Sequence, residues 1–203
     1  MILKADRIAD LLQKGEDDVQ DPLVIAPQPA IKDLVESGSA SVDLRLGTWF
    51  VALRQARVTH WQIDNPPSEA QLAKSHYVPF GSEYILHPKA FVLGTTLEWI
   101  RLPKNLAAYV VGKSSWGRHG LIIATATGVH PGFTGCLTLE LTNVGEIPVA
   151  IRPGMTICQL FFHSVEDSGT DHIDQSRFVC MRKPSLGTIR QDEMALKLGN
   201  ANY

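Results

Sequence analysis

A serine and an arginine four residues apart are the first candidates for chemistry in this chain. The apolar run Leu106–Val111 ends just before Lys113, Ser114, Ser115 and Arg118, which predicts a strand that leads into a short helix. Ser114 or Ser115 can cap that helix and leave backbone N–H groups facing an anion, while Ser114 and Arg118 share one helical face. Small donors and two cations suit a polyphosphate. The alternative is an ordinary helix cap with solvated charges.

A carboxylate in the middle of a predicted strand is the second candidate. From Cys136 to Asn143, Leu137, Leu139 and Leu141 alternate with polar residues. A strand places alternate side chains on opposite faces, so the leucines face a core and Glu140 faces away from it, between Thr138 and Thr142. A carboxylate there can move protons in general acid–base catalysis. A solvated outer face explains the pattern equally well.

Between these two segments lies a glycine-rich turn. The stretch Thr127–Gly135 contains Gly128, Val129, His130, Pro131 and Gly132, and we interpret it as a hairpin turn.

The elements that must position these residues are mostly strands. Ile8, Leu11 and Leu12 follow a helical period that Gly15 can end, and a second short helix around Leu34 ends near Gly38. After that, alternating runs separated by Gly and Pro turns dominate, as in residues 91–98 and 136–143. Many short strands with frequent turns predict a mainly β fold, a barrel or a sandwich.

Composition excludes several functional classes. The net charge of −2 shows no basic surface for nucleic acid, so no nucleic acid partner is expected. The longest apolar stretches are too short to cross a membrane, and the N-terminus lacks a signal-peptide pattern. The three cysteines, Cys136, Cys158 and Cys180, are widely spaced, which disfavours a disulfide framework and favours a reducing cytoplasm.

The order of the three segments resembles the zinc-independent dCTP deaminases of the trimeric dUTPase superfamily, which include bifunctional deaminase–dUTPases. Further matches run along residues 1–165 and weaken in the tail. They are Ser41-Val42-Asp43-Leu44-Arg45-Leu46-Gly47, Leu86-His87-Pro88, Thr96-Leu97-Glu98, Leu102-Pro103, Arg152-Pro153-Gly154-Met155 and Ile157-Cys158-Gln159-Leu160.

The resemblance implies the architecture of the whole chain. We expect one dUTPase-like domain over residues 1–203, a distorted β jelly roll or dUTPase-like barrel with a few short helices. It implies a homotrimer with active sites between subunits. The polar tail, about residues 167–203, is expected to close over the active site.

The resemblance also implies an activity, the hydrolytic deamination of dCTP to dUTP and ammonia, which supplies dUTP for thymidylate synthesis. Mg²⁺ is expected on the substrate triphosphate. No zinc is expected, since the H-x-E and C-x-x-C signature of zinc deaminases is missing. The implied catalytic residues are Glu140 as proton shuttle, Ser114 and the Ala126 carbonyl as water ligands, and Arg118. The implied substrate-binding residues are Lys113, Ser115, Val129, His130, Thr138, Gln159 and Arg177.

The chain departs from the family pattern at several positions. His130 replaces an aspartate that activates water and contacts the sugar in related dUTPases, which weakens the expectation of dUTP hydrolysis. Lys113 replaces an arginine and loses bidentate phosphate geometry. Gly128 stands where bifunctional members often carry an aromatic residue, and Met181 stands where a glutamine is expected. A bifunctional enzyme or dUTPase is therefore the alternative, and a non-catalytic nucleotide-binding regulator is the second alternative.

Overall fold

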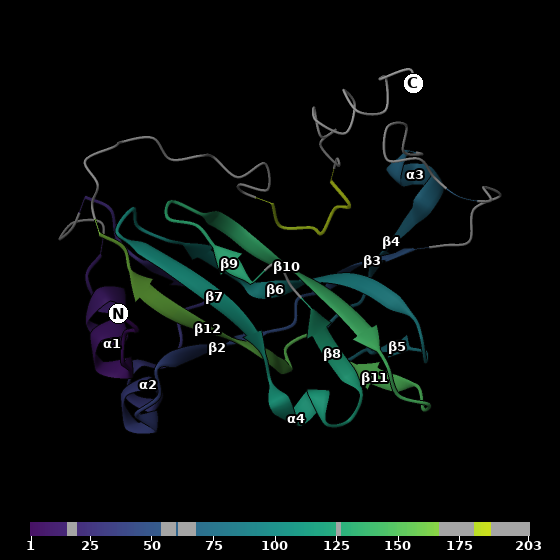
Figure 1. Ribbon diagram of the computed structural model, residues 1–203, viewed down its shortest axis with the longest axis horizontal. Coiled ribbons are helices and arrows are strands. Elements are labelled where there is room, and N and C mark those ends of the chain that lie inside the picture. The colour runs from purple at the N-terminus through teal and green to yellow at the C-terminus, as the bar shows by residue number, and fades with distance from the viewer. Residues whose placement is uncertain (16–19, 54–59, 61–67, 125–126, 167–180, 188–203) are drawn as a thin grey trace, which may run out of the picture.

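A computed structural model shows that the protein is mainly β with a few short helices, as predicted (Figure 1). It describes residues 1–15, 20–53, 60, 68–124, 127–166 and 181–187. The helices are α1 (Ala5–Gln13), α2 (Ile31–Ser37), α3 (Glu69–Leu72) and α4 (Ser114–Gly117). The strands are β1 (Val24–Ala26), β2 (Ser41–Arg45), β3 (Trp49–Leu53), β4 (Ala73–Tyr77), β5 (Tyr84–Leu86), β6 (Phe91–Arg101), β7 (Leu106–Gly112), β8 (Leu121–Ala124), β9 (Gly128–Val129), β10 (Thr134–Asn143), β11 (Val149–Ile151) and β12 (Thr156–Ser164).

Two larger sheets enclose the core. One has the order β4-β3-β6-β10-β8, with β1 added alongside β6, and the other has the order β2-β12-β7-β9. A third, two-stranded sheet joins β5 and β11. Buried side chains of both larger sheets, such as Leu139 on β10 and Phe162 on β12, belong to one hydrophobic cluster. Within the described residues, no strand pairing closes these sheets into a barrel.

Both helices predicted near the N-terminus are present, and they pack against one another at one end of the molecule (Figure 1). Ile8 is fully buried, as its helical period predicted. α2 ends at Gly38, whose φ of 60° is readily available to glycine and whose N–H donates to the Val35 carbonyl over 3.1 Å. None of the described helices is both long and apolar enough to cross a membrane.

Strand β10 has the two faces that its alternating sequence predicted. Leu137, Leu139 and Leu141 are at most 6% exposed, whereas Thr138 and Glu140 are half-buried on the other face. Burying each leucine stabilises the fold by about 1.5–3 kcal/mol relative to leaving it exposed. The leucines therefore fix which way the strand faces, and Glu140 is directed away from the core as a consequence.

The glycine-rich turn differs from the hairpin we expected. β9 pairs with β7, where Val129 lies opposite Ala108, whereas β10 pairs with β6 and β8. The turn from His130 to Phe133 therefore carries the chain from one sheet to the other. Gly132 has a φ of 75° in this turn, and the Phe133 N–H donates to the His130 carbonyl over 3.2 Å. Sequence alone could not reveal this difference, because a hairpin and a crossover use the same turn residues.

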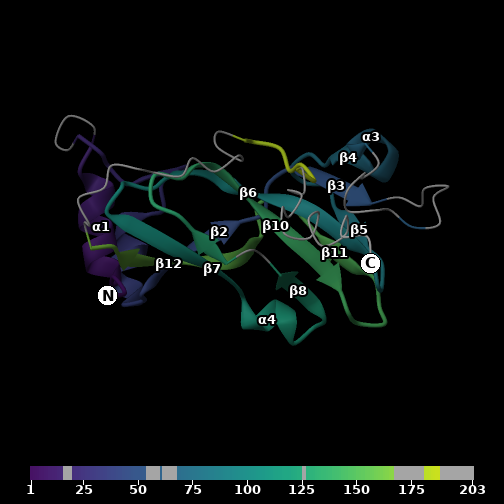
Figure 2. The same ribbon diagram turned by 45° about the horizontal axis from the view of Figure 1, so that its top comes forward.

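The described part of the tail, residues 181–187, lies against the outer face of the first sheet. The Cys136 N–H donates to the Met181 carbonyl over 2.9 Å, and Pro184 is buried. This segment is the yellow trace above β10 and β6 in Figure 1 and is also drawn in yellow in Figure 2. Its Lys183 ammonium lies over the ring of Trp49 on β3. The rest of the predicted tail, with Arg177, lies outside the described residues.

Candidate active site

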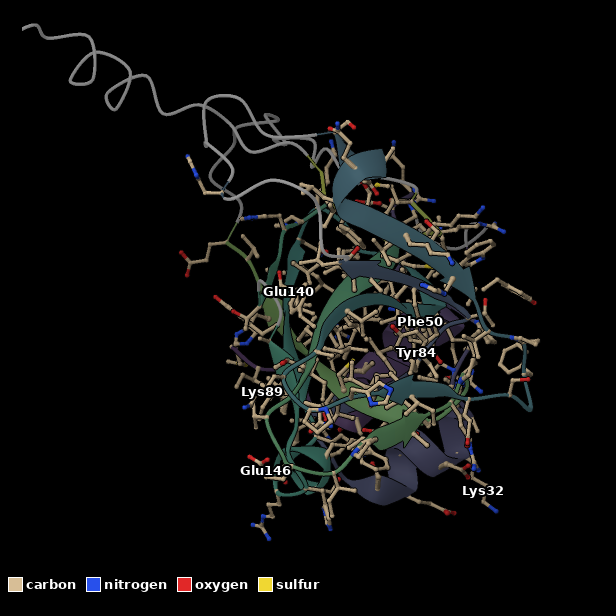
Figure 3. All side chains as sticks on the ribbon, turned by 90° about the vertical axis from the view of Figure 1, so that its right-hand side faces the viewer. Lys32, Phe50, Tyr84, Lys89, Glu140 and Glu146 are labelled. Carbon is tan, nitrogen blue, oxygen red and sulfur yellow. The ribbon has the colours of Figure 1, made fainter. Side chains whose placement is uncertain are left out.

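Glu140 lies partway along β10 with its side chain on the polar face. It is opposite Leu93 on β6 and opposite Ala124 on β8. Figure 3 shows Glu140 well away from Glu146, which follows the end of the strand. Among the described residues the side chain of Glu140 forms no hydrogen bond or ion pair, so its carboxylate is available to a ligand.

The serine–arginine segment forms a short helix, α4, as predicted, but neither serine caps it. The N-cap residue is Lys113, whose carbonyl accepts the N–H groups of Trp116 and Gly117. The predicted serine cap is wrong because the helix begins at Ser114, so both serines lie inside it. Ser114 and Arg118 lie one turn apart, joined by a backbone hydrogen bond of 3.0 Å, and both are exposed.

The position of α4 depends on a tryptophan. The indole N–H of Trp116 donates to the Thr156 carbonyl over 2.8 Å, and the Lys113 N–H donates to the Ile157 carbonyl over 3.1 Å. Both contacts tie α4 to β12, and Ser114, Ser115 and Arg118 remain on the solvent side.

Lys113 and Gln159 meet at an aspartate that the sequence analysis did not assign to the site. The Lys113 ammonium lies 2.6 Å from one Asp43 carboxylate oxygen, and the Gln159 amide donates to the other over 3.2 Å. β2 and β7 both pair with β12, which brings these residues together. In the sequence, the only indication that Asp43 belongs to the site was its place within Ser41–Gly47, one of the segments that match the family. The structure thus brings two predicted substrate-binding residues together around one carboxylate.

A buried asparagine connects α4 to the strand that carries Glu140. Asn143 ends β10 and is fully buried, and its amide donates to the Leu86 and Ile147 carbonyls while its oxygen accepts the Gly145 N–H. The next residue, Val144, donates its N–H to the Gly120 carbonyl over 2.8 Å. A Cβ on Gly120 would lie 2.9 Å from the Gly145 nitrogen, so this close approach requires glycine.

The structure does not bring Glu140 into contact with the α4 residues. No hydrogen bond or ion pair joins Glu140 to Ser114 or Arg118 in the described part of the chain. α4 nevertheless leads directly into β8, whose Ala124 lies opposite Glu140. One subunit therefore places the two groups in neighbouring elements without joining them.

The other predicted binding residues have different surroundings. Val129 is 5% exposed, so its side chain belongs to the core and only its backbone can contact a nucleotide. His130 is exposed in the crossover turn, and Thr138 is half-buried opposite Thr95 on β6. Ala126 lies outside the described residues, as does Arg177.

The two described cysteines are free and differ in their surroundings. Burial, together with the nearby carboxylates of Glu98 and Asp43, raises the pKa of the Cys158 thiol to about 12. Burial also raises the pKa of Cys136, while Arg182 lowers it. Across the described ranges, no three His, Cys, Asp or Glu side chains gather in a group that could hold a metal ion.

Comparison with known proteins identifies the family. A family model described as dCTP deaminase-like matches residues 2–165. The "dCTP deaminase, dUMP-forming" of Methanobrevibacter smithii is 37% identical over 165 residues, 81% of this chain and 80% of that protein. The "dCTP deaminase" of Halorubrum lacusprofundi is 41% identical over 163 residues, 80% of this chain and 76% of that protein.

A solved structure shows the same fold. The crystal structure of 2'-deoxycytidine 5'-triphosphate deaminase from Agrobacterium tumefaciens superimposes with a TM-score of 0.58 at 20% sequence identity. The match covers 81% of this chain and 48% of that one. With the family match over residues 2–165 and the identity to these relatives, the chain belongs to the dCTP deaminase-like family.

Proposed function

We propose that this protein catalyses the hydrolytic deamination of dCTP to dUTP and ammonia. The observation that carries the proposal is Glu140, an unpaired and half-buried carboxylate on the polar face of β10. It lies one strand from the segment that holds Lys113, Ser114 and Arg118. Relatives with 37–41% identity bear the name dCTP deaminase, which supports the same substrate.

The proposed reaction adds water to cytosine C4 and releases ammonia. Water adds across the C4=N3 bond: Glu140 takes a proton from the water as its oxygen bonds to C4, and N3 receives that proton. Glu140 then passes the remaining hydroxyl proton to the exocyclic nitrogen as the bond from C4 to that nitrogen breaks. Ammonia leaves, and the oxygen stays on C4 as the carbonyl of uracil. Ser114 and the Ala126 carbonyl orient the water, and Arg118 stabilises the developing charge.

The triphosphate is assigned to the other end of the site. Lys113 supplies positive charge, and Ser115, Gln159 and Arg177 supply further donors. The contact of Lys113 with Asp43 supports this assignment, because a partly exposed lysine held by one carboxylate can exchange that partner for a phosphate. Val129, His130 and Thr138 are assigned to the sugar and the base. Mg²⁺ enters with the triphosphate, and we propose that the reaction needs no zinc.

We also propose that the active site is completed between subunits of a homotrimer. In one chain, Glu140 has no bond to Ser114 or Arg118, and both are exposed. A second copy that brings its α4 against the polar face of β10 would supply the missing partner. The free thiols of Cys136 and Cys158 fit a reducing cytoplasm.

The second candidate is a bifunctional enzyme that also hydrolyses dUTP to dUMP. The name of the Methanobrevibacter smithii relative includes "dUMP-forming", which favours this candidate. His130 disfavours it, since an imidazole differs from a carboxylate in charge and reach, and a base displaced by about 1 Å loses about 10²-fold in rate. A nucleotide-binding regulator without catalysis is the third candidate.

A product time course separates the three candidates. The protein is incubated with dCTP and Mg²⁺, and separately with dUTP, and dUTP, dUMP, ammonia and pyrophosphate are resolved. Ammonia with accumulating dUTP supports the proposal, whereas pyrophosphate released from either substrate identifies a bifunctional enzyme. Nucleotide binding without either product identifies a regulator. One tightly bound zinc per chain that activity requires would contradict the zinc-independent mechanism.

A further inference from the structure

A cavity of about 520 Å³ opens on the same sheet face as Glu140, but the residues proposed for deamination do not line it. Its lining combines aromatic, hydroxyl, thiol and cationic side chains, namely Trp49, Thr95, Trp99, Cys136 and Arg182, with the backbone of Gly47. A volume of this size accommodates a molecule as large as a mononucleotide.

An irregularity in the strand pairing lies beside this cavity. β10 and β6 pair regularly at Thr138 and Thr95, but the register shifts between Thr138 and Cys136, which lies opposite Trp99. Between these two pairs β6 has three residues (96–98) where β10 has only Leu137, so two extra residues on β6 interrupt the ladder. Residues opposite one another share a sheet face, so Thr95, Trp99 and Cys136 all face outward like Glu140.

The floor of the cavity holds a hydroxyl group without a partner. Thr95 is 3% exposed, yet its hydroxyl has no hydrogen bond to any described residue. Burying a hydroxyl without a partner is costly, so such a group in a cavity points to a ligand or water that satisfies it. Gly47 keeps the hydroxyl open, because a Cβ there would lie 2.8 Å from the Thr95 oxygen.

Arg182 is the one charged residue among the described residues that line the cavity, and the nearby Glu98 carboxylate, which raises the pKa of Cys136, is paired with Arg45. No carboxylate is among its lining residues, and Arg182 is exposed and forms no ion pair with any described residue. A second cation is close, since the Lys183 ammonium lies 3.9 Å from the centre of the Trp49 ring. Both cations belong to the segment 181–187, which the contact between Met181 and Cys136 holds in place.

From these groups together, we propose that the cavity is a second ligand site, which takes a flat aromatic ring carrying an anionic group. Trp99 offers a surface for stacking, the Thr95 hydroxyl offers a hydrogen bond, and Arg182 pairs with the anion. The ligand is either a nucleotide or a non-nucleotide aromatic anion, because both present the same chemistry to these residues.

The test is a binding titration of the full chain without dCTP, so that its outcome does not depend on deamination. The probes are dUMP, followed by calorimetry, and 8-anilinonaphthalene-1-sulfonate, followed by fluorescence, with inorganic phosphate as the ring-free control. We expect at least one aromatic probe to bind with a Kd below about 1 mM. Thr95→Val, which removes one hydrogen bond, should weaken that binding about fivefold.

Two more variants and two controls locate the binding. Trp99→Leu should weaken it at least about fivefold through lost stacking, and Arg182→Gln should weaken it about tenfold through the lost charge. Trp116→Phe should leave it unchanged, since Trp116 belongs to the α4 region, and Lys113→Ala detects a probe that occupies the proposed dCTP site instead. If Trp99→Leu fails to fold, the other two variants remain informative. Arg182→Gln changes an exposed side chain, and Thr95→Val keeps the shape of the side chain that it replaces.

Each outcome decides the proposal. Binding of dUMP that depends on Thr95 and Arg182 identifies a nucleotide site, and binding of the sulfonate alone identifies a site for other aromatic anions. If neither probe binds, the proposal is wrong. It is equally wrong if Lys113→Ala weakens binding while Thr95→Val and Arg182→Gln do not, because the probe then occupies the proposed dCTP site. That last result would leave the proposed deaminase function standing.

Discussion

At the scale of single residues, the site combines groups whose surroundings suit different tasks. The carboxylate of Glu140 is half-buried and unpaired, so it can exchange a proton with a ligand. The ammonium group of Lys113 pairs with the Asp43 carboxylate, and the lysine side chain is partly exposed. Arg118 is exposed at the end of α4, and its guanidinium group has no partner among the described residues. The proposed proton transfer and the proposed charge binding thus belong to residues on separate elements, and substitutions can separate them.

Glu140→Gln should abolish deamination while leaving the fold and nucleotide binding intact. The amide keeps the size of the side chain but cannot accept a proton, and general acid–base catalysis is worth about 10²–10⁴-fold. Ammonia release and dCTP affinity are the measurements. Glu146→Gln, an exposed carboxylate beyond the end of the same strand, is the matched control and should keep full activity. Wild-type turnover in Glu140→Gln would rule out the assignment.

Lys113→Ala and Arg118→Ala should affect different kinetic constants. Loss of Lys113 removes charge that binds the triphosphate equally in the ground and transition states, so KM should rise while kcat stays near the wild-type value. Loss of Arg118 should lower kcat. Steady-state kinetics of both variants with dCTP make the comparison. A raised KM alone in both variants would contradict the catalytic role of Arg118.

At the scale of elements, the position of α4 relative to β10 depends on the turn that follows β10. Asn143 satisfies two carbonyls and one N–H there, and the neighbouring backbone of Val144 holds the turn that joins α4 to β8. Together with the contacts of Trp116 and Lys113 with β12, these hydrogen bonds hold α4 in its position.

Asn143→Ala should lower the free energy of unfolding by about 3 kcal/mol, because it leaves buried backbone groups without partners. Urea unfolding measures the loss. The control is Asn105→Ala, since Asn105 is exposed, and its replacement should change stability by less than about 0.5 kcal/mol. Equal effects of both substitutions would show that the Asn143 hydrogen bonds contribute little.

The buried Cys158 thiol on β12 should lower the free energy of unfolding at alkaline pH. Burial raises the pKa of Cys158 from 9.0 to about 12, so between these values the folded chain keeps a proton that the unfolded chain has lost. Below pH 9 the titration of Cys158 costs no stability. As the pH rises from 9 toward 12, the free energy of unfolding decreases by up to about 1.4 kcal/mol per pH unit.

Cys158→Ala should remove this contribution. The variant is less stable overall because of the cavity, yet the difference from wild type should shrink as pH rises through this window. Urea unfolding of both proteins at several alkaline pH values measures the difference, and taking the difference cancels the titration of lysines and tyrosines. A constant difference across the window would show that Cys158 titrates normally.

At the scale of the whole molecule, Glu140 and Arg118 belong to neighbouring elements and do not contact one another in one chain. This observation is the reason for proposing that the site is completed between subunits.

Mixed assemblies test this arrangement. Glu140→Gln and Arg118→Ala subunits, each inactive or weak alone, should regain activity when co-assembled, because some sites then take Glu140 from one subunit and Arg118 from another. Random mixing in equal amounts predicts about a quarter of the sites restored in a symmetric oligomer. Chains carrying both substitutions, mixed with Glu140→Gln chains, are the control and should stay inactive. A mixture no more active than its components would place each site within one subunit.

The sequence by itself determined the features that depend on local periodicity. Alternation along residues 136–143 was enough to assign the leucines to the core and Glu140 to the outer face, because a strand has a period of two. The helical spacing around Ile8 and the glycine at 38 located the first two helices. The order of the motifs identified the family, which the comparisons confirm.

Only the tertiary structure decided which distant segments meet. Asp43 and Lys113 are 70 positions apart and form a pair because β2 and β7 flank the same strand. The pairing of β9 with β7 rather than with β10, and the cavity around Thr95 and Trp99, follow from registers between strands. Periodicity shows which way a side chain faces but not what it faces, because strand partners and registers are set by packing of the whole core.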